Sequence, residues 1–340
     1  MKYLCCLVLS IVILTGVNAQ KKKENLKTKL SSYYGGEVDF KNQAPGSVGF
    51  AFGNGFQITS KDSTSRLKIE FRFQSLFIAS KDLNTEDKMS TNFIVRRSRL
   101  KFGGFAFTPK LVYKVELGLS NRDISPSKDF EEVGQGPKLI LDAVLKWRFH
   151  KNFTLWMGQT KLPGNRERVI SSQKLQFVDR SILNSKFNLD RDMSVQLHSE
   201  FEAHNALIRF AAAISTGDGR DITAGNFGGF GYTGRFEFLP MGKFTSKGDY
   251  FSSDLSRESK PKLSLAFTYD FNNNASREGG RLGNFLKDAN DEYLHSNLTT
   301  LFADMMFKYR GLSVLAEMAR KESSVKNSGF ASGTAVSAQF

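Results

Sequence analysis

Most of this sequence consists of segments in which apolar and polar side chains alternate. In residues 66–74 (RLKIEFRFQ) every second side chain is apolar, and those between are charged or polar. Because successive side chains of a β-strand point to opposite faces, such a strand has one apolar and one charged face. Similar segments predict about twelve strands, at 66–79, 94–107, 111–120, 138–149, 153–162, 193–201, 206–215, 228–238, 262–271, 300–309, 312–320 and 333–340.

The lengths of the strands and connections distinguish a membrane barrel from a soluble β-sandwich. Strands of soluble sheets average roughly five or six residues, whereas a tilted membrane strand needs about 9–11. Short connections at 108–110, 150–152, 202–205 and 310–311 alternate with long ones at 80–93, 121–137, 163–192, 216–227, 272–299 and 321–332, as in outer-membrane barrels. The long connection 239–261 breaks this alternation. We predict an all-β fold, a transmembrane antiparallel β-barrel over residues 47–340.

The N-terminal residues have the pattern of an export signal. A basic start is followed by an apolar run at 4–17 and the small-residue site Val17-Asn18-Ala19, which predicts a signal peptide at 1–19. Residues 20–46 are polar and show no period, so we expect a flexible periplasmic lead-in. Both cysteines lie within the signal, and the mature chain therefore has no thiol. Export with a barrel predicts the outer membrane of a Gram-negative bacterium, with lipid as a partner.

The chain carries a net charge of +14, and strand alternation predicts where that charge points. A Lys or Arg at the lipid midplane costs roughly 2–4 kcal/mol, so the apolar faces must meet lipid and the charged faces must line the lumen. The anion-pathway cations predicted by alternation are Lys68, Arg72, Arg97, Arg99, Lys101, Lys114, Lys146, Arg148, Arg209 and Arg235, with Lys308 on the same face. Inward carboxylates are expected at Glu70, Glu116, Asp142, Glu200, Glu237, Asp270, Asp304 and Glu317.

Two interpretations of these cations remain open. They can pair with the inward carboxylates, so that the charges of the inner face merely cancel, or they can attract small anions. The row Arg97-Arg99-Lys101 has no acid between its members. Its three positive charges therefore repel one another unless anions or carboxylates from neighbouring segments bind them. By the same alternation Arg96 is expected on the outer face, near anionic headgroups.

The connection 163–192 is the longest internal one and is rich in arginine. If it folds into the barrel, Arg166, Arg168, Arg180 and Arg191 would form a constriction, since guanidinium groups bind phosphate and carboxylate bidentately. The alternative is an ordinary solvated surface loop.

Other functional classes find little support in the residues. Nucleic acid is excluded as a partner by export. His198-Ser199 point to opposite strand faces, and His295-Ser296 lie in a loop without a third group, so neither forms a catalytic set. Residues 229–234 match the GxGxxG spelling but lack a βαβ unit. We therefore expect no enzyme activity, cofactor or metal site.

Three stretches resemble the phosphate-selective porins O and P. They are residues 105–120 (FAFTPKLVYKVELGLS), 140–147 (ILDAVLKW) and above all 156–172 (WMGQTKLPGNRERVISS), followed by 175–181 (LQFVDRS). The resemblance implies a sixteen-stranded homotrimeric barrel whose inward cations pass phosphate or related anions, with a loop forming the constriction. Only Lys161, Arg166 and Arg168 lie in the matching motif, so the resemblance implies a role at the pore constriction for these three and adds Lys161 to the anion-pathway cations. About twelve strands against sixteen suggests a chain that is incomplete at its C-terminus, or a smaller barrel that ends on Phe340.

The functional expectation is an outer-membrane porin that passes small anions, with phosphate or polyphosphate as candidates. A general diffusion porin without phosphate preference is one alternative. A structural or adhesive barrel with a plugged lumen is the other.

Overall fold

The computed structural model describes residues 8–9, 46–51, 55–81, 89–124, 138–223, 228–326 and 329–340. Apart from Val8, Leu9 and Gly46, the expected signal peptide and lead-in lie outside these residues. No helix within the described ranges is long and apolar enough to cross a membrane.

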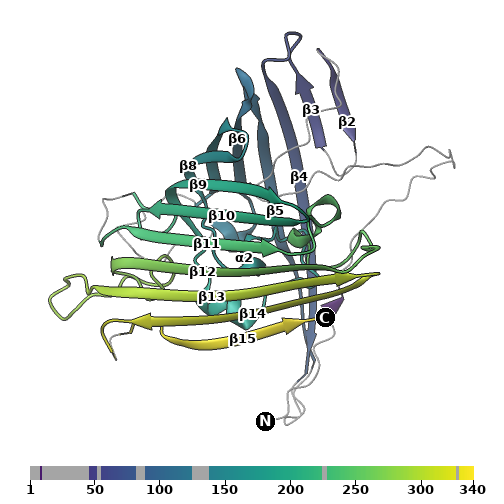
Figure 1. Cartoon of the computed structure of the whole chain (residues 1–340). Helices are drawn as coiled ribbons and strands as arrows, with labels where there is room; N and C mark the ends of the chain where they lie inside the picture. The colour runs from purple at the N-terminus through teal and green to yellow at the C-terminus, as the bar shows by residue number, and fades with distance from the viewer. Residues whose placement is uncertain are drawn as a thin grey trace.

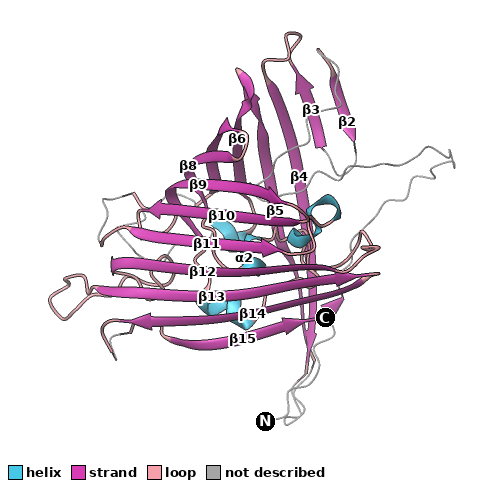
Figure 2. Ribbon diagram, in the orientation of Figure 1, coloured by secondary structure: helices cyan, strands magenta, loops and turns pink. Residues whose placement is uncertain are grey.

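The fold is one antiparallel sheet whose strands follow chain order from β2 to β15 (Figures 1 and 2). Its fourteen strands confirm the all-β prediction and exceed the twelve expected. The strands are β2 (Val48–Ala51), β3 (Gly55–Thr59), β4 (Arg66–Ser80), β5 (Ser90–Ala106), β6 (Thr108–Gly118), β7 (Ile140–His150), β8 (Phe153–Lys161), β9 (Arg191–Ala203), β10 (Ala206–Ser215), β11 (Gly231–Leu239), β12 (Lys262–Ala275), β13 (Ser296–Tyr309), β14 (Leu312–Ser323) and β15 (Gly333–Gln339).

The sheet curves strongly, and within the described residues its ends do not meet. In Figure 1, β2 to β6 stand almost upright while β9 to β15 lie across the view. The edge strands β2 and β15 are not paired with each other within the described ranges. Strand β1 (Val8–Leu9) pairs with β4. The twelve expected strands correspond to β4–β15. The two additional ones, β2 and β3, have only four and five residues.

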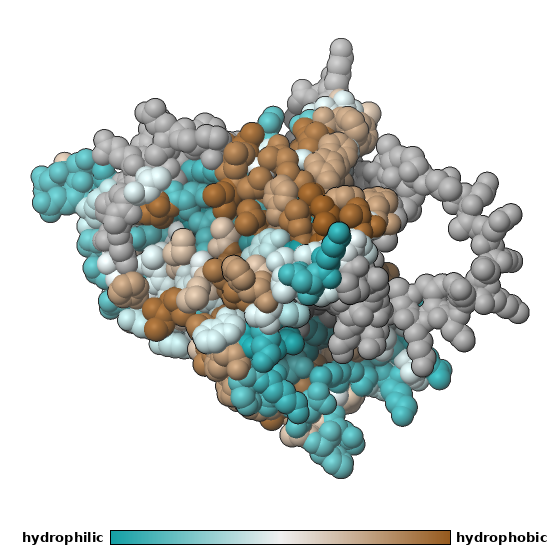
Figure 3. Space-filling view, turned by 90° about the horizontal axis from the view of Figure 1, so that it is seen from above, coloured by the Kyte–Doolittle hydropathy of each residue, from teal (hydrophilic) through white to brown (hydrophobic). Residues whose placement is uncertain are grey.

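Alternation along the strands gives the sheet an apolar outer face and a polar inner face. In β4 the side chains of Phe71 and Phe73 are 65% and 57% exposed, whereas Lys68, on the opposite face, is 4% exposed. The same pattern recurs in β10 and β11, where Phe210 and Phe236 are exposed and their tilted rings contact each other. Figure 3 shows hydrophobic residues gathered in one broad area of the surface. A face of this kind suits contact with lipid.

The connection between β8 and β9, residues 162–190, folds against the inner face and is called the first inner loop here. It contains the short helices α2 (Arg166–Val169) and α3 (Ile182–Phe187). Leu183 and Phe187 of α3 pack with Phe302 of β13 and Ala319 of β14 in a buried cluster. The loop therefore crosses from the β8 side of the sheet to the β13–β14 side. In the connection after β6, the described residues contain one short helix, α1 (Asn121–Ile124).

The connection between β11 and β12, residues 240–261, is the second inner loop. It includes the 3₁₀ turn η2 (Thr245–Tyr250), and Phe244 and Tyr250 are buried with Met306 and Leu315. Lys308 of β13 donates hydrogen bonds of 2.7–2.8 Å to three of its backbone carbonyls. These contacts explain why a connection at the short-turn end of the sheet is so long: it forms part of the core.

Candidate functional site

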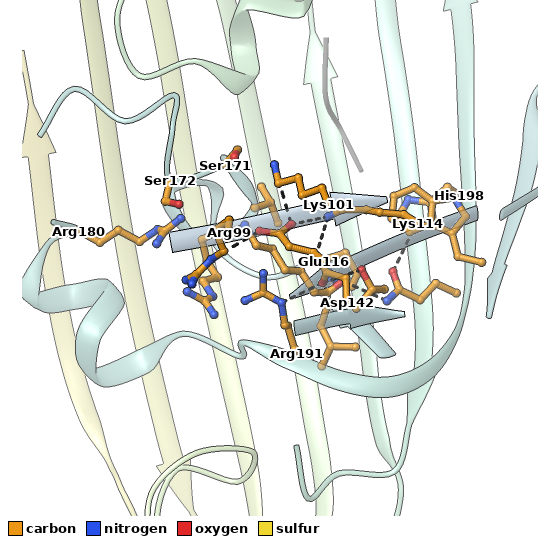
Figure 4. A pocket seen from close by; sticks show the side chains of 18 of the residues that line it. Arg99, Lys101, Lys114, Glu116, Asp142, Ser171, Ser172, Arg180, Arg191 and His198 are labelled. Carbon is orange, nitrogen blue, oxygen red and sulfur yellow. Dashed lines mark hydrogen bonds and ion pairs between the residues drawn. The ribbon is translucent and has the colours of Figure 1, made fainter. Parts of the chain in front are cut away.

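A cavity that is partly open to solvent lies between the first inner loop and the inner face of β5–β9 (Figure 4). Eight cationic side chains line it and only two carboxylates do. The cations are Arg97, Arg99, Lys101, Lys114, Lys161, Arg168, Arg180 and Arg191, and the carboxylates are Glu116 and Asp142. Three of these cations also pair with carboxylates beside the cavity, Arg97 with Asp179, Arg99 with Asp123 and Arg168 with Asp190, which leaves an excess of three positive charges. This excess makes the cavity attractive to anions.

The row Arg97-Arg99-Lys101 in β5 faces carboxylates from three other segments. Arg97 pairs with Asp179 of the first inner loop at 3.2 Å. Arg99 donates to both carboxylate oxygens of Asp123 in α1, one of them at 2.8 Å, and lies 3.7 Å from Glu116. The Lys101 ammonium is 4.0 Å from Glu116. The row is thus held by carboxylates from a neighbouring strand and from loops, as the spacing of its charges requires.

Arg96 lies on the inner side, and the expectation that it faces outward is wrong. Gln74 of β4 is opposite Arg97 while Ser75 is opposite Val95, so Arg96 is the extra residue of a β-bulge. A bulge re-aims the side chain of the inserted residue. Arg96 consequently joins Arg97 in an ion pair with Asp179.

A compact charge cluster forms the floor of the cavity. Lys114 of β6 binds Asp142 at 2.6 Å and Glu116 at 2.9 Å, and Arg191 of β9 binds Asp142 at 2.9 Å. In Figure 4 Glu116, Asp142 and Arg191 lie below Lys101, and Lys114 lies to its side. Because both carboxylates are already shared among several cations, they do not neutralise the cavity.

Backbone carbonyls of the first inner loop hold Lys161 at the end of β8 and Arg180 of the loop, whereas Arg168 pairs with the Asp190 carboxylate. Lys161 donates to the carbonyls of Arg168 and Ile170 at 2.7 and 3.2 Å, and Arg180 donates to those of Glu167 and Ile170 at 2.8 and 2.9 Å. Burial, followed by the field of Arg97, lowers the pKa of Arg180 to about 10. Burial, followed by the field of Arg180, also lowers the pKa of Arg168. Both shifts therefore come first from burial and second from neighbouring cations.

Arg166 lies elsewhere, because its side chain is fully buried and does not line the cavity. It donates to Asp304 at 2.7 Å, to Ser264 at 2.9 Å and to the Asp249 carbonyl at 3.1 Å. Burial alone would lower its pKa, but Asp304 and Glu237 outweigh burial and raise it. Arg166 is therefore placed to anchor the first inner loop to the sheet and to the second inner loop.

Residues 67–248, more than half of the chain, match the family of phosphate-selective porins O and P. The chain belongs to this porin family. Membership confirms the resemblance and places the chain among outer-membrane channel proteins rather than in an enzyme family. A search of curated proteins finds no match.

The remaining cations of the expected anion path are spread around the porin's inner face. Arg72 donates to Ser172 of the first inner loop at 2.8 Å, and Lys68 pairs with Glu70 at 2.8 Å. Lys146 lies 3.7 Å above the Trp156 ring, and Arg148 is exposed at the end of β7.

Arg209 and Arg235 lie in a buried ion-pair network on the other side of the first inner loop. Arg209 pairs with Glu200 and Asp249 at 2.8 and 2.5 Å, and Arg235 pairs with Glu237 and Asp304 at 2.8 and 2.7 Å. Together with Arg166 they fill the space enclosed by β10–β13. The charged inner face is therefore divided into a filled half and a cavity.

Several cavity residues cannot be predicted from charge alone. Trp156 stacks on His198 at a ring distance of 4.0 Å, and Ser171 and Ser172 bring hydroxyl groups from the first inner loop. Neither ring carries a fixed charge, so charge did not point to either of them as part of the site. Among the described residues, no group of three or more His, Cys, Asp or Glu side chains is arranged to hold a metal ion.

Proposed function

We propose that this porin passes small anions, inorganic phosphate among them, along a path between the β4–β8 wall and the first inner loop. The observation that carries this proposal is the cavity, in which eight cations face two carboxylates. In a confined, partly buried space such an excess raises the local anion concentration and excludes cations. Guanidinium and ammonium groups also provide the charged hydrogen-bond donors that oxyanions prefer.

The pairing of the strands supports a continuous path along the wall. Arg72 of β4 is opposite Arg99, and Glu70 is opposite Lys101. Lys114 of β6 is opposite Gly103 of β5, two residues further toward the short-turn end. Cations thus succeed one another at intervals of two residues, so that an anion leaving one of them meets the next.

Ion selectivity in planar bilayers tests the proposal. The double variant Arg168→Gln/Arg180→Gln removes two cavity cations, and Arg320→Gln is its matched control, because Arg320 is exposed and paired with Glu322. We expect the reversal potential in a KCl gradient to move toward zero in the double variant and to stay at the wild-type value in the control. A wild-type channel without anion preference would contradict the proposal.

Phosphate preference separates this proposal from a general diffusion porin. Inorganic phosphate that binds in the cavity should inhibit the chloride current at concentrations well below that of chloride, and the double variant should need more of it. Equal inhibition by phosphate and by a neutral solute of similar size would favour general diffusion.

A plugged structural barrel is the second candidate, and the filled half of the inner face favours it. Arg166, Arg209 and Arg235 are all at most 8% exposed within their ion-pair network. A barrel closed by this network would conduct no current in bilayers. Measurable single-channel steps would eliminate this candidate.

We also propose that the mature porin begins at Gln20 and assembles as a homotrimer in the outer membrane. The apolar run before Ala19 and the family resemblance support the two parts respectively. N-terminal sequencing of the membrane protein and native mass spectrometry in detergent test them.

A further inference from the structure

Glu317 of β14 links helix α2 of the first inner loop to the inner face of the sheet. The residue is buried, with 4% of its surface exposed. One carboxylate oxygen accepts a hydrogen bond of 2.7 Å from the Glu167 backbone amide, and the other accepts one of 3.2 Å from the Asn165 side chain. Both donors lie at the start of α2, so the charge of this carboxylate affects how firmly α2 is held against β14.

The charged groups that face Glu317 are acidic. Asp304 of β13 lies directly opposite it in the strand register, and both side chains are buried on the inner face. The Glu167 carboxylate of α2, whose charge Arg180 offsets in part, is also within electrostatic range. On β15 the residue opposite is Ser337, which carries no charge. Like charges directly opposite each other in a sheet are destabilising, so an ionised Glu317 is repelled from two sides.

The basic side chains of this region bind other groups. Arg166 and Arg235 both bind Asp304 at 2.7 Å. Among the residues that the structure describes, no basic side chain forms an ion pair with Glu317. A charge on Glu317 is therefore stabilised only by two amide donors, and burying a carboxylate without a counter-charge is costly. A proton bound to this carboxylate removes that cost.

Helix α2 also forms one side of the cavity, since Arg168 and Val169 line it. The contact of the loop with β5 involves a different segment, because Arg97 holds the Val178 carbonyl at 2.8 Å. Arg166 keeps α2 attached to β13 whatever the charge of β14. A loosened α2 can therefore shift locally and widen the cavity, while the rest of the loop and the cations of β5 stay in place.

We propose that Glu317 is a proton-controlled latch of the porin: it holds α2 against β14 while it carries a proton, and it loosens α2 when it ionises as the pH rises. The inference rests on the proposed function, because the latch regulates the same anion path. The sign follows from the charges. A neutral carboxyl group keeps its hydrogen bond to the Glu167 amide without being repelled by Asp304 and Glu167, whereas an ionised one is repelled by both.

Hydrogen exchange on the full chain in detergent measures the latch independently of ion flow. Exchange of residues 165–170 is followed at pH 5 and pH 8 and corrected for the pH dependence of an unprotected amide. We expect wild-type protection to fall at least about five-fold at pH 8, the effect of one like-charge contact at the dielectric constant of water. Glu317→Gln should show the same protection at both pH values.

Glu322→Gln is the matched control for this variant. Glu322 lies on the same strand, but it is exposed and pairs with Arg320, so its variant should keep the wild-type pH dependence. The pH dependence is compared rather than the level of protection, because Glu317→Gln also alters the contact with Asn165. Wild-type protection that is equal at the two pH values, or that falls as much in Glu317→Gln, would overturn the latch.

Single-channel recordings provide the second readout. The ratio of the conductance at pH 8 to that at pH 5 should be larger in the wild type than in Glu317→Gln, and equal ratios would overturn the latch. Reversal potentials of the two proteins should agree at each pH, because the cations of the cavity are the same in both. If the latch fails while the wild-type channel is anion-selective, the proposed function stands; the proposed function fails only if wild-type currents show no anion preference.

Discussion

Arg97 of β5 donates a hydrogen bond of 2.8 Å to the backbone carbonyl of Val178 in the first inner loop. The next residue, Asp179, pairs with the same arginine. Two adjacent residues of the loop therefore bind one end of the cation row on the wall. This contact fixes the width of the cavity, because the loop cannot move away from β5 without breaking it.

Neutralising Asp179 should increase the anion preference of the channel. Asp179→Asn removes a half-exposed carboxylate that pairs with Arg96 and Arg97, so that both guanidinium groups face the path uncompensated. The ratio of anion to cation permeability, measured from reversal potentials in KCl gradients, should rise. Asp291→Asn is the control, since Asp291 forms an exposed ion pair with Lys287. A ratio that falls in Asp179→Asn would show that this carboxylate lies off the path.

Removing the anchor of the first inner loop should destabilise the porin. Arg166→Gln leaves Asp304 without one of its two arginine partners, and breaking a buried ion pair costs about 3–5 kcal/mol. Arg320→Gln breaks an exposed pair, and the expected cost is below about 1 kcal/mol. Urea unfolding in detergent micelles gives both free energies. Equal stabilities would show that Arg166 is not an anchor.

The same variant should release the loop from the inner face. Limited proteolysis should then cut Arg166→Gln within residues 162–190 faster than the wild type, because the backbone there loses its links to β13 and to the second inner loop. The Arg320→Gln control should be cut at the wild-type rate.

Alternation of apolar and polar residues was sufficient to predict β4–β15, because each of these strands has one polar face and one apolar face. It could not predict β2 and β3, whose few residues include Gly49 and Gly55 and give too short a pattern. It also placed Arg96 on the wrong face, since one bulge residue reverses the parity of everything beyond it.

The eight basic residues that line the candidate cavity were all named from the sequence, but so were seven that do not line it, and the partner of each charge was not predicted. Arg97 and Lys101 are cavity residues, while Arg166 and Arg209 are buried in ion pairs, although all four are basic residues assigned to the same lumen. The difference depends on contacts across 40 to 138 positions of sequence, such as those of Arg209 with Asp249 and of Arg166 with Asp304. No local pattern encodes such contacts.

Cysteine labelling should report the two faces of β4. Phe71 is 65% exposed on the outer face, and Arg72 follows it on the inner face. In a background that lacks Cys5 and Cys6, Phe71→Cys should react with lipid-phase probes and Arg72→Cys with membrane-impermeant thiol reagents. The reverse outcome would contradict the orientation of the wall and, with it, the anion path.

Alkaline pH should weaken anion selectivity through Lys174. Burial, followed by the fields of Lys101 and Lys247, lowers the pKa of Lys174 to about 8, although Asp249 and Glu70 act in the opposite direction. The ammonium is therefore charged below this pH and loses its charge as the pH rises through it, so anion preference should decline between pH 7 and pH 9.

Two variants assign this pH effect to Lys174. Lys174→Arg keeps its charge over the whole range and should give a flat profile, since arginine remains protonated. Lys174→Gln should show the reduced preference already at pH 7. Reversal potentials recorded from pH 6 to pH 9.5 measure all three proteins, and the Arg180 guanidinium, with a pKa of about 10, stays mostly charged throughout. A wild-type profile that matches that of Lys174→Arg would show that Lys174 does not take part in selecting the ion.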